Sequence, residues 1–423
     1  MPRHTAAMRV AIIGAGISGL GCAHILRDSH EVTVFEAEPR AGGHSDTAEV
    51  PGPAGGVPVD LGFIVYNERT YPRFTQLLRD LRVESSPSDM SFGAAIDAAD
   101  LEYRLSSPAS ILAQPRSIVR GSYLRMLWEI TRFNRAALRL AEAPGDEGRS
   151  LGAFVDELGL SKELRDWFLV PLGSAIWSAN PDTFLEFPAS TYARFMDNHG
   201  LLRIRDVPPW RTVTGGSRSY VQALTAPLGD RLRLGEAVRS VRRTGDGVEI
   251  ATAAGPALYD RAILAVHSDQ ALAMLDEPTR AQREVLGAIA YRANAVTLHH
   301  DAQIMPRARR AWASWNVRVP ERSEHAPTLS YWMNNLQPLA TQTPWFVSLN
   351  SDHLIDPATV AARRSLSHPV FDLGARAAQR RQAEIQGAGG VFFAGAWWHN
   401  GFHEDGLRSA HEACAALLGA APA

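Results

Sequence analysis

Three glycines near the N-terminus constrain the fold more than any other feature of this sequence. Gly14, Gly16 and Gly19 follow a short apolar run at 10–13 and precede a segment, 17–26, whose apolar residues have helical spacing. In such a strand–turn–helix unit the first glycine permits a tight turn. The second lets a pyrophosphate approach the backbone, and the third lets helix and strand pack closely. The helix start offers unpaired N–H groups and a positive dipole end to the phosphates. The motif therefore predicts a dinucleotide site rather than a tight turn without a ligand.

An acidic residue stands where the ribose of a bound dinucleotide is expected. A second strand at 31–35 ends at Glu36, 22 residues after Gly14. A carboxylate at this position can accept hydrogen bonds from ribose hydroxyls. Another glycine pair, Gly42 and Gly43, follows soon after. A unit that binds NAD has no need of a second pair, whereas the longer FAD runs on past its pyrophosphate, so the pair favours FAD.

The segment Arg40-Ala41-Gly42-Gly43 resembles the R-x-G-G element of one superfamily of flavoproteins, which includes the FAD-dependent amine oxidases, the protoporphyrinogen oxidases and the phytoene desaturases. The resemblance extends over nearly the whole chain after Met8. Within the superfamily the sequence is most similar to a bacterial branch of NAD/FAD-binding oxidoreductases, which resembles the flavin domain fused to plant cyclopropane fatty acid synthases. Four segments carry this similarity: Asn67-Glu-Arg-Thr-Tyr-Pro72, Trp315-Asn316, Tyr331-Trp332-Met333-Asn334 and Gly401-Phe-His-Glu-Asp-Gly-Leu407.

The resemblance implies an α/β fold with two interleaved domains. One is a Rossmann-like FAD-binding domain of the glutathione reductase-like, amine oxidase type, expected at 8–70, 206–267 and 388–423. The other is an α+β substrate domain with an antiparallel sheet and a helical cap, expected at 71–205 and 268–387. A D-x-G element at 57–62 is expected to return the chain to the flavin ring, and the start of the last helix, with Asp405 as its N-cap, to face the flavin N1/C2=O edge.

The resemblance also implies a set of residues at the cofactor. His44 stands where many members carry arginine, and Ala396 stands where many carry an acid, for which Glu404 or Asp405 is the expected substitute. The full expected set is Gly14, Gly16, Ser18, Gly19, Glu36, Arg40, Gly42, Gly43, His44, Gly62, Phe63, Ile64, Val238, Gly395, Ala396, Glu404, Asp405, Gly406 and Leu407.

Candidates for the substrate side come from several segments. Short apolar strands at 296–299, 311–317, 328–332 and 345–349 predict an antiparallel sheet, which includes Tyr331. Trp177 is either a core anchor or a cavity wall, and Asn67 either faces substrate or closes a turn. His399 and His403 are proton-transfer candidates near neutral pH. Although they are four residues apart, the loop around Gly401 argues against a metal site.

The composition limits the partners. The net charge of −2 gives no reason to expect nucleic acid, no apolar run is long enough to span a membrane, and residues 1–7 have no signal-peptide core. Two isolated cysteines, Cys22 and Cys414, suggest buried side chains and a cytoplasmic protein. The arginine-rich segment 108–142 is interpreted as a cap helix with a solvated arginine face. The alternative is peripheral contact with the inner membrane.

Three functions follow as hypotheses. The preferred one is an FAD-dependent oxidoreductase that takes a hydride from a hydrophobic substrate, and the branch resemblance implies a lipid or fatty-acyl compound. The second is a flavin amine oxidase. It is disfavoured because those enzymes commonly hold a lysine near the flavin and this chain has only Lys162. The third is a redox-neutral isomerase or an FAD-binding partner of a lipid-modifying enzyme.

A second G-x-G-x-x-G is missing, so no separate NADPH site is expected. The oligomeric state and the electron acceptor are not indicated.

Overall fold

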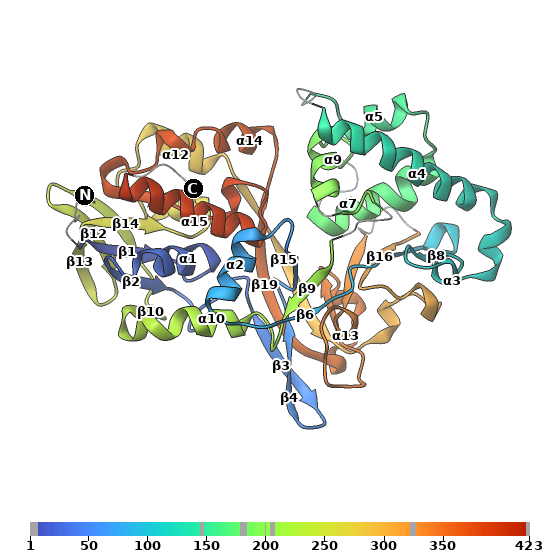
Figure 1. Ribbon diagram of the computed structural model, residues 1–423, viewed down its shortest axis with the longest axis horizontal. Helices are drawn as coiled ribbons and strands as arrows, with labels where there is room; N and C mark the ends of the chain where they lie inside the picture. The colour runs from blue at the N-terminus through green and yellow to red at the C-terminus, as the bar shows by residue number, and fades with distance from the viewer. Residues whose placement is uncertain are drawn as a thin grey trace.

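A five-stranded parallel sheet forms the centre of the first lobe (Figure 1), in a computed structural model that describes residues 7–143, 148–177, 184–198, 200–203, 208–321 and 327–419. Its strand order is β10-β2-β1-β14-β20. The strands are β1 (Arg9–Ile13), β2 (Glu31–Glu36), β10 (Leu232–Leu234), β14 (Arg261–Leu264) and β20 (Val391–Phe393). After Arg9 every residue of β1 is buried, as expected of a central parallel strand covered on both faces.

Two helices from opposite ends of the chain cover one face of this sheet. They are α1 (Ile17–Leu26) and α15 (His403–Leu418), and they lie side by side in Figure 1. Their approach is close, because a Cβ added at Gly21 would come within 2.9 Å of the Leu407 side chain. The first and last segments of the sequence are thus joined in one unit, as the sequence predicted.

The opposite face carries a small antiparallel sheet and three helices. The strands are β11 (Ser240–Thr244), β12 (Gly247–Thr252) and β13 (Gly255–Tyr259), and the helices are α11 (Ser268–Met274), α12 (Arg280–Gly287) and α14 (Leu373–Gln379). The strands β11 and β12 form a hairpin whose turn contains Gly245. Arg233 precedes this hairpin and lies in β10, which pairs with β2.

A seven-stranded mixed sheet forms the base of the second lobe, in the order β19-β15-β18-β17-β16-β7-β8. The strands are β7 (Phe92–Ile96), β8 (Leu101–Arg104), β15 (Ala290–His299), β16 (Trp315–Val319), β17 (Thr328–Trp332), β18 (Phe346–Leu349) and β19 (Val360–Val370). The four predicted strands of this region are present as β15 to β18. The pairing of β7 with β16 is parallel, so the sheet is not purely antiparallel.

Helices cover this second sheet as a cap. They are α3 (Pro108–Ile111), α4 (Gly121–Glu142), α5 (Leu151–Glu157), α6 (Lys162–Leu164), α7 (Val170–Trp177) and α9 (Ala189–Asn198), with α13 (Met333–Leu336) at a strand end. The segment 151–177 is divided into several short helical elements. A π-helical turn, Arg165–Leu169, follows α6, and α7 then carries Pro171 in its first turn, where proline is tolerated.

Shorter elements connect the lobes. A three-stranded sheet joins β5 (Val65–Asn67), β9 (Trp210–Val213) and β6 (Ser85–Pro87), and a hairpin joins β3 (Thr47–Gly52) to β4 (Gly55–Asp60). The helices α2 (Pro72–Asp80) and α10 (Arg218–Thr225) pack into the core of the first lobe. The proposed domain division is therefore amended, because α2, α11, α12 and α14 lie in segments assigned to the cap but pack with the parallel sheet. No helix in the described ranges is long and apolar enough to cross a membrane.

Candidate active site

A cavity of about 480 Å³ lies between the two lobes. One side is formed where the parallel strands end: Gly14 follows β1, Glu36 ends β2, Ala265 follows β14 and Gly395 follows β20, and all four line the cavity. Ligands of open α/β sheets bind at these carboxyl ends. The other side is formed by the cap and the seven-stranded sheet. The cavity thus has two walls. One is formed by the carboxyl ends of the parallel strands, where a nucleotide can bind, and the other by the cap and the seven-stranded sheet.

The three glycines of the first turn have different surroundings. A Cβ added at Gly14, whose φ is +100°, would lie 2.6 Å from the Ala265 carbonyl oxygen, and one at Gly19 would lie 1.9 Å from the Gly14 carbonyl oxygen. These two glycines are required by the packing. A Cβ at Gly16 would meet nothing within 4 Å, and Gly16 lines the cavity. The open space beside Gly16 is where a phosphate can approach the backbone.

The N-terminus of α1 faces the same space. Its first intrahelical hydrogen bond runs from the Leu20 N–H to the Gly16 carbonyl, so the N–H groups of the preceding turn are not used within the helix. Ile17 and Ser18 of that turn line the cavity. This arrangement suits a pyrophosphate.

Backbone groups hold the Glu36 carboxylate at the cavity edge. Its Oε2 accepts a hydrogen bond from the Ala15 N–H at 2.8 Å, and its Oε1 accepts one from the Glu38 N–H at 2.9 Å. Each oxygen keeps further acceptor capacity. Glu36 is therefore fixed where a ribose can donate to it.

The second glycine pair packs against the first turn. The Gly42 N–H donates to the Ala15 carbonyl at 2.8 Å, and a Cβ at Gly43 would lie 3.2 Å from the Gly16 Cα. Arg40 does not line the cavity. Its Nη2 donates to the Gly43 carbonyl at 3.1 Å and lies 3.3 Å from a carboxylate oxygen of Asp46. Arg40 therefore fixes this turn, and the expectation that it lies against FAD is not supported by its position.

Three histidines meet on the cavity wall near this turn. The ring centroid of His44 lies 5.5 Å from that of His368 and 6.2 Å from that of His267. Burial, together with the neighbouring histidines His368 and His267, lowers the pKa of His44 to about 3. The imidazole that replaces the family's arginine is therefore neutral.

We expect His44 to make the fold acid-sensitive. A histidine with a folded-state pKa near 3 and an unfolded-state pKa near 6.5 gives stability that is present above pH 6.5 and is lost as the pH falls. Between pH 7 and pH 5 the unfolding free energy of the wild type should fall by about 2 kcal/mol more than that of His44→Gln. Urea denaturation of both proteins at the two pH values measures the difference, and equal losses would contradict it.

The start of α15 differs from the prediction in one respect. Asp405 is not the N-cap but lies at the third helical position, where its Oδ2 accepts from the Phe402 N–H at 2.9 Å and from the Asn400 N–H at 3.2 Å. The acid thus ties down the loop that precedes the helix. Gly406 lies against α1, since a Cβ there would come within 3.0 Å of the Ser18 Oγ.

Glu404 points away from the cavity. Its carboxylate accepts from the Arg73 and Phe74 N–H groups, both at 3.0 Å, and so caps the N-terminal turn of α2. The expectation that Glu404 replaces the family's acid at the cofactor is therefore not supported. Leu407 and Val238 are buried in core clusters and also do not line the cavity.

Of the two candidate histidines, His403 lines the cavity and His399 does not. The His403 ring stacks on Phe63 with centroids 3.7 Å apart, and its Nε2 lies 2.8 Å from the Tyr220 hydroxyl, which in turn hydrogen-bonds to Ser45. Burial lowers the pKa of His403 to about 3. His399 instead places its Nε2 3.0 Å from a Glu412 carboxylate oxygen, off the cavity. The structure thus separates two residues that the sequence treated alike.

The wall opposite the nucleotide edge is aromatic. Trp315 and Tyr331 pair across β16 and β17 with ring centroids 5.2 Å apart, and Phe195 stacks on Phe402 at 5.0 Å. All four line the cavity. Trp332, one residue along β17, points to the other face of the sheet and packs in a separate cluster.

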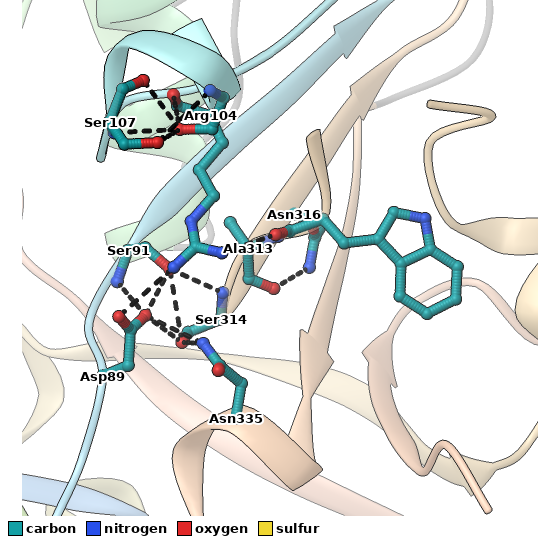
Figure 2. Close-up of polar contacts among 10 residues, drawn as sticks. Asp89, Ser91, Arg104, Ser107, Ala313, Ser314, Asn316 and Asn335 are labelled. Carbon is teal, nitrogen blue, oxygen red and sulfur yellow. Dashed lines mark hydrogen bonds and ion pairs between the residues drawn. The ribbon is translucent and has the colours of Figure 1, made fainter. Parts of the chain in front are cut away.

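A polar network behind this wall was not anticipated from the sequence (Figure 2). The Asp89 carboxylate accepts from the Ser314 hydroxyl at 2.6 Å and from the Asn335 amide at 2.9 Å, and lies 3.3 Å from an Arg104 nitrogen. These bonds join the strand starts that carry Phe92 and Trp315. The network therefore fixes the wall from outside the cavity.

Other expected residues lie elsewhere. Asn67 is fully buried outside the cavity and its Oδ1 accepts from the Thr70 N–H at 2.9 Å, which favours the turn-closing interpretation. The Trp177 side chain lies outside the described residues. Gly62, Ile64 and Ala396 line the cavity. No cluster of potential metal ligands is found among the described residues.

The comparison with protein families decides the relationship. The model of the family described as flavin-containing amine oxidoreductase matches residues 17–343, which is more than half of the chain. The chain belongs to this family. The chain is 29% identical over 282 residues to AofH of Mycobacterium tuberculosis, which is named as a flavin-containing monoamine oxidase. The match covers 64% of this chain and 59% of AofH, so the chain spans less than two thirds of that relative.

Solved structures share the fold at low identity. A putrescine oxidase variant superposes with a TM-score of 0.68 at 16% identity, over 98% of this chain and 99% of its own. A CLA-producing fatty acid isomerase from P. acnes superposes with a TM-score of 0.70 at 15% identity, over the same shares of the two chains. A cyclohexylamine oxidase from Brevibacterium oxydans has a TM-score of 0.66 at 18% identity, over 98% and 99%. The α/β FAD-binding fold predicted from the sequence is confirmed.

FAD is the cofactor of this flavin-containing amine oxidoreductase family, and the residues present fit it. The open side of Gly16, the free N–H groups at the start of α1 and the fixed Glu36 carboxylate form a cradle for a ribose and a pyrophosphate. The predictions of FAD and of an FAD-dependent oxidoreductase are thus confirmed at the level of the family.

Proposed function

We propose that the protein is an FAD-dependent oxidoreductase that removes a hydride from the uncharged hydrocarbon part of a hydrophobic substrate, most simply a fatty-acyl chain. Bound FAD supplies the hydride acceptor. The substrate would lose a hydride and a proton from neighbouring carbons and gain a double bond. The reduced cofactor would be reoxidised by oxygen, a quinone or another acceptor.

The single observation that carries this proposal is the chemistry of the cavity wall. Among the described residues that line the cavity, the only carboxylate is Glu36, at the nucleotide edge, and no lysine or arginine is present. The wall on the cap side is built from large apolar and aromatic side chains, namely Met90, Phe92, Leu172, Phe195, Leu201, Trp210, Trp315 and Tyr331. Such a wall desolvates a hydrocarbon at little cost but gives a charged ammonium group no counter-ion.

The chain's own residues would act in two ways. The aromatic wall would orient the substrate and exclude water. His403 would present a neutral imidazole to the substrate, since it lines the cavity, its pKa is lowered to about 3, and its hydrogen bond to Tyr220, which continues to Ser45, fixes the ring. His403 is chosen over His399 for this role because His399 is paired with Glu412 and does not line the cavity.

The second candidate function is amine oxidation, which is favoured by the name of the Mycobacterium relative and by the oxidases that share the fold. Those enzymes commonly hold a lysine near the flavin. Lys162 is the only lysine in the chain. Its side chain is 77% exposed on the cap, 3.8 Å from Asp166.

We expect Lys162→Met to leave turnover unchanged within about a factor of two, because an exposed ion pair of this kind contributes little. Steady-state rates of the two holoenzymes on the same substrate measure this. A loss of ten-fold or more would return the lysine, and with it amine oxidation, to consideration.

Anaerobic mixing of the holoenzyme with defined compounds tests the proposed reaction. One series contains stearate, oleate and linoleate, and the other contains cyclohexylamine and putrescine. Bleaching of the flavin absorbance by a fatty acid, with a more unsaturated product in the mass spectrum, is the expected result. Bleaching by amines alone would overturn the proposal in favour of amine oxidation. A shifted double bond without bleaching would assign a redox-neutral isomerase.

A further inference from the structure

The outer surface of the cap carries a concentration of exposed apolar side chains. Ile118 and Val119, in the 3-10 helix Pro115–Val119, are 57% and 82% exposed, and Leu124 and Trp128 on α4 are 42% and 58% exposed. We call these four residues the apolar patch. Leu124 and Trp128 are four positions apart and so lie on the same face of α4. Exposed patches of this kind commonly mark interaction sites.

The apolar patch is not needed to anchor α4. The opposite face of the helix is already buried in the cap core through Tyr123, Met126, Phe133, Ala137 and Leu140. The helix packs against α9, whose Phe195 lines the cavity. The outer face is therefore free for a partner, and the expectation of a merely solvated arginine face leaves its leucine and tryptophan unexplained.

Arginines surround the apolar patch: Arg116, Arg120, Arg125, Arg132, Arg135 and Arg139. Some have partners, since Arg116 pairs with Asp100 and Arg125 lies 2.8 Å from Glu163. Arg135 and Arg139 are exposed and have no acidic partner within the described part of the chain. Of the two carboxylates in α4, Glu129 is 4% exposed and accepts hydrogen bonds from Ser161 on the inner side, whereas Glu142 is exposed at the last residue of the helix. The outer face is therefore cationic along most of the helix.

We propose that this face docks on the surface of an anionic lipid bilayer. The apolar patch would enter the interface, where tryptophan is favoured, and the arginines would meet lipid phosphates. The guanidinium of Arg132 lies 4.8 Å from the centre of the Trp128 ring, which places a cation directly beside the inserted indole. Charge complementarity favours a lipid surface over a second copy of this chain, because a symmetric contact would bring the arginines of both copies together.

Sedimentation of the holoenzyme with vesicles tests the proposal. We expect binding to phosphatidylglycerol vesicles, little binding to phosphatidylcholine vesicles, and release as the salt concentration rises. The double variant Arg135→Glu/Arg139→Glu and the double variant Val119→Ser/Trp128→Ser should each weaken partitioning by about ten-fold or more.

Two control variants lie in segments that pack with the first lobe. Leu373→Ser removes an apolar side chain that is 78% exposed, and Arg280→Glu reverses a charge on a side chain that is 92% exposed. Both should bind vesicles as the wild type does, and all variants should keep the wild-type melting temperature and turnover on detergent-dispersed substrate.

Three outcomes would overturn the proposal: no binding to anionic vesicles, equal loss in the control variants, or a change of oligomeric state in the patch variants without a change in vesicle binding. The docking proposal can fail while the proposed reaction stands, because turnover in detergent is measured separately.

Discussion

Gly16→Val is expected to give a folded protein that purifies without colour. Gly16 has a φ of −76° and a ψ of −177°, which valine adopts without strain, and a Cβ at this position would meet no protein atom within 4 Å. The added side chain would instead enter the cavity beside the start of α1, where the pyrophosphate of FAD needs close contact with the backbone. FAD affinity should fall by on the order of 100-fold or more.

The flavin released per mole of denatured protein measures this effect, and circular dichroism checks the fold. The matched control is Gly245→Val, in the β11–β12 turn, where an added Cβ also meets nothing within 4 Å but faces away from the cavity lining. That variant should retain a full complement of flavin. If Gly16→Val kept the same yellow colour, the first turn would not be the phosphate site.

The FAD-binding side of the cavity could be predicted from the sequence because the contacts that constrain it join residues that are close together in the sequence. Gly14 and Gly19 have almost no space for a side chain, so their spacing is fixed by steric contact within one strand–turn–helix unit. Glu36 could be predicted for the same reason, because it ends the strand that directly follows this unit. The positions of Arg40 and Glu404 do not support their expected roles, because a charged residue near a motif has several possible partners, and here Asp46 and the start of α2 contact them.

The aromatic side of the cavity could be predicted only in outline because its contacts join residues that are far apart in the sequence. Trp315 meets Phe195 and Phe402 around one cavity although these residues are far apart in the sequence. The strand β19 was missed because its sequence, Val-Ala-Ala-Arg-Arg-Ser-Leu-Ser-His-Pro-Val, has no regular apolar alternation and its partner β15 lies some 70 residues earlier. The Asp89 network is similar, since its serine and asparagine partners come from segments more than 200 residues away.

Asp60→Ala is expected to destabilise the protein by about 3–5 kcal/mol, since removal of a buried, multiply bonded carboxylate leaves its partners unpaired. Asp60 is fully buried at the end of β4. Its carboxylate accepts from the Thr47 hydroxyl at 2.6 Å, from the Ser217 N–H at 2.9 Å and from the Gln337 amide at 2.8 Å. The Ser217 hydroxyl also donates to this carboxylate, at 2.8 Å, so alanine would leave four donors from three separate segments without an acceptor. Urea denaturation of the holoenzyme measures the loss, and a change below 1 kcal/mol would show that water replaces the carboxylate.

The pH dependence of the unfolding free energy distinguishes the effect of burial on the Asp60 carboxyl from the effect of its hydrogen bonds. Burial raises the pKa of Asp60 to about 6, against the lowering effect of its hydrogen bonds. Because the folded-state pKa lies above the unfolded value near 4, protonation favours the folded state. This contribution is present below pH 4 and is lost as the pH rises through 6. Relative to Asp60→Asn, which cannot ionise, the wild type should lose about 2 kcal/mol between pH 4 and pH 6.5. A constant difference between the two proteins over this range would mean that the hydrogen bonds, rather than burial, control the ionisation of this carboxylate.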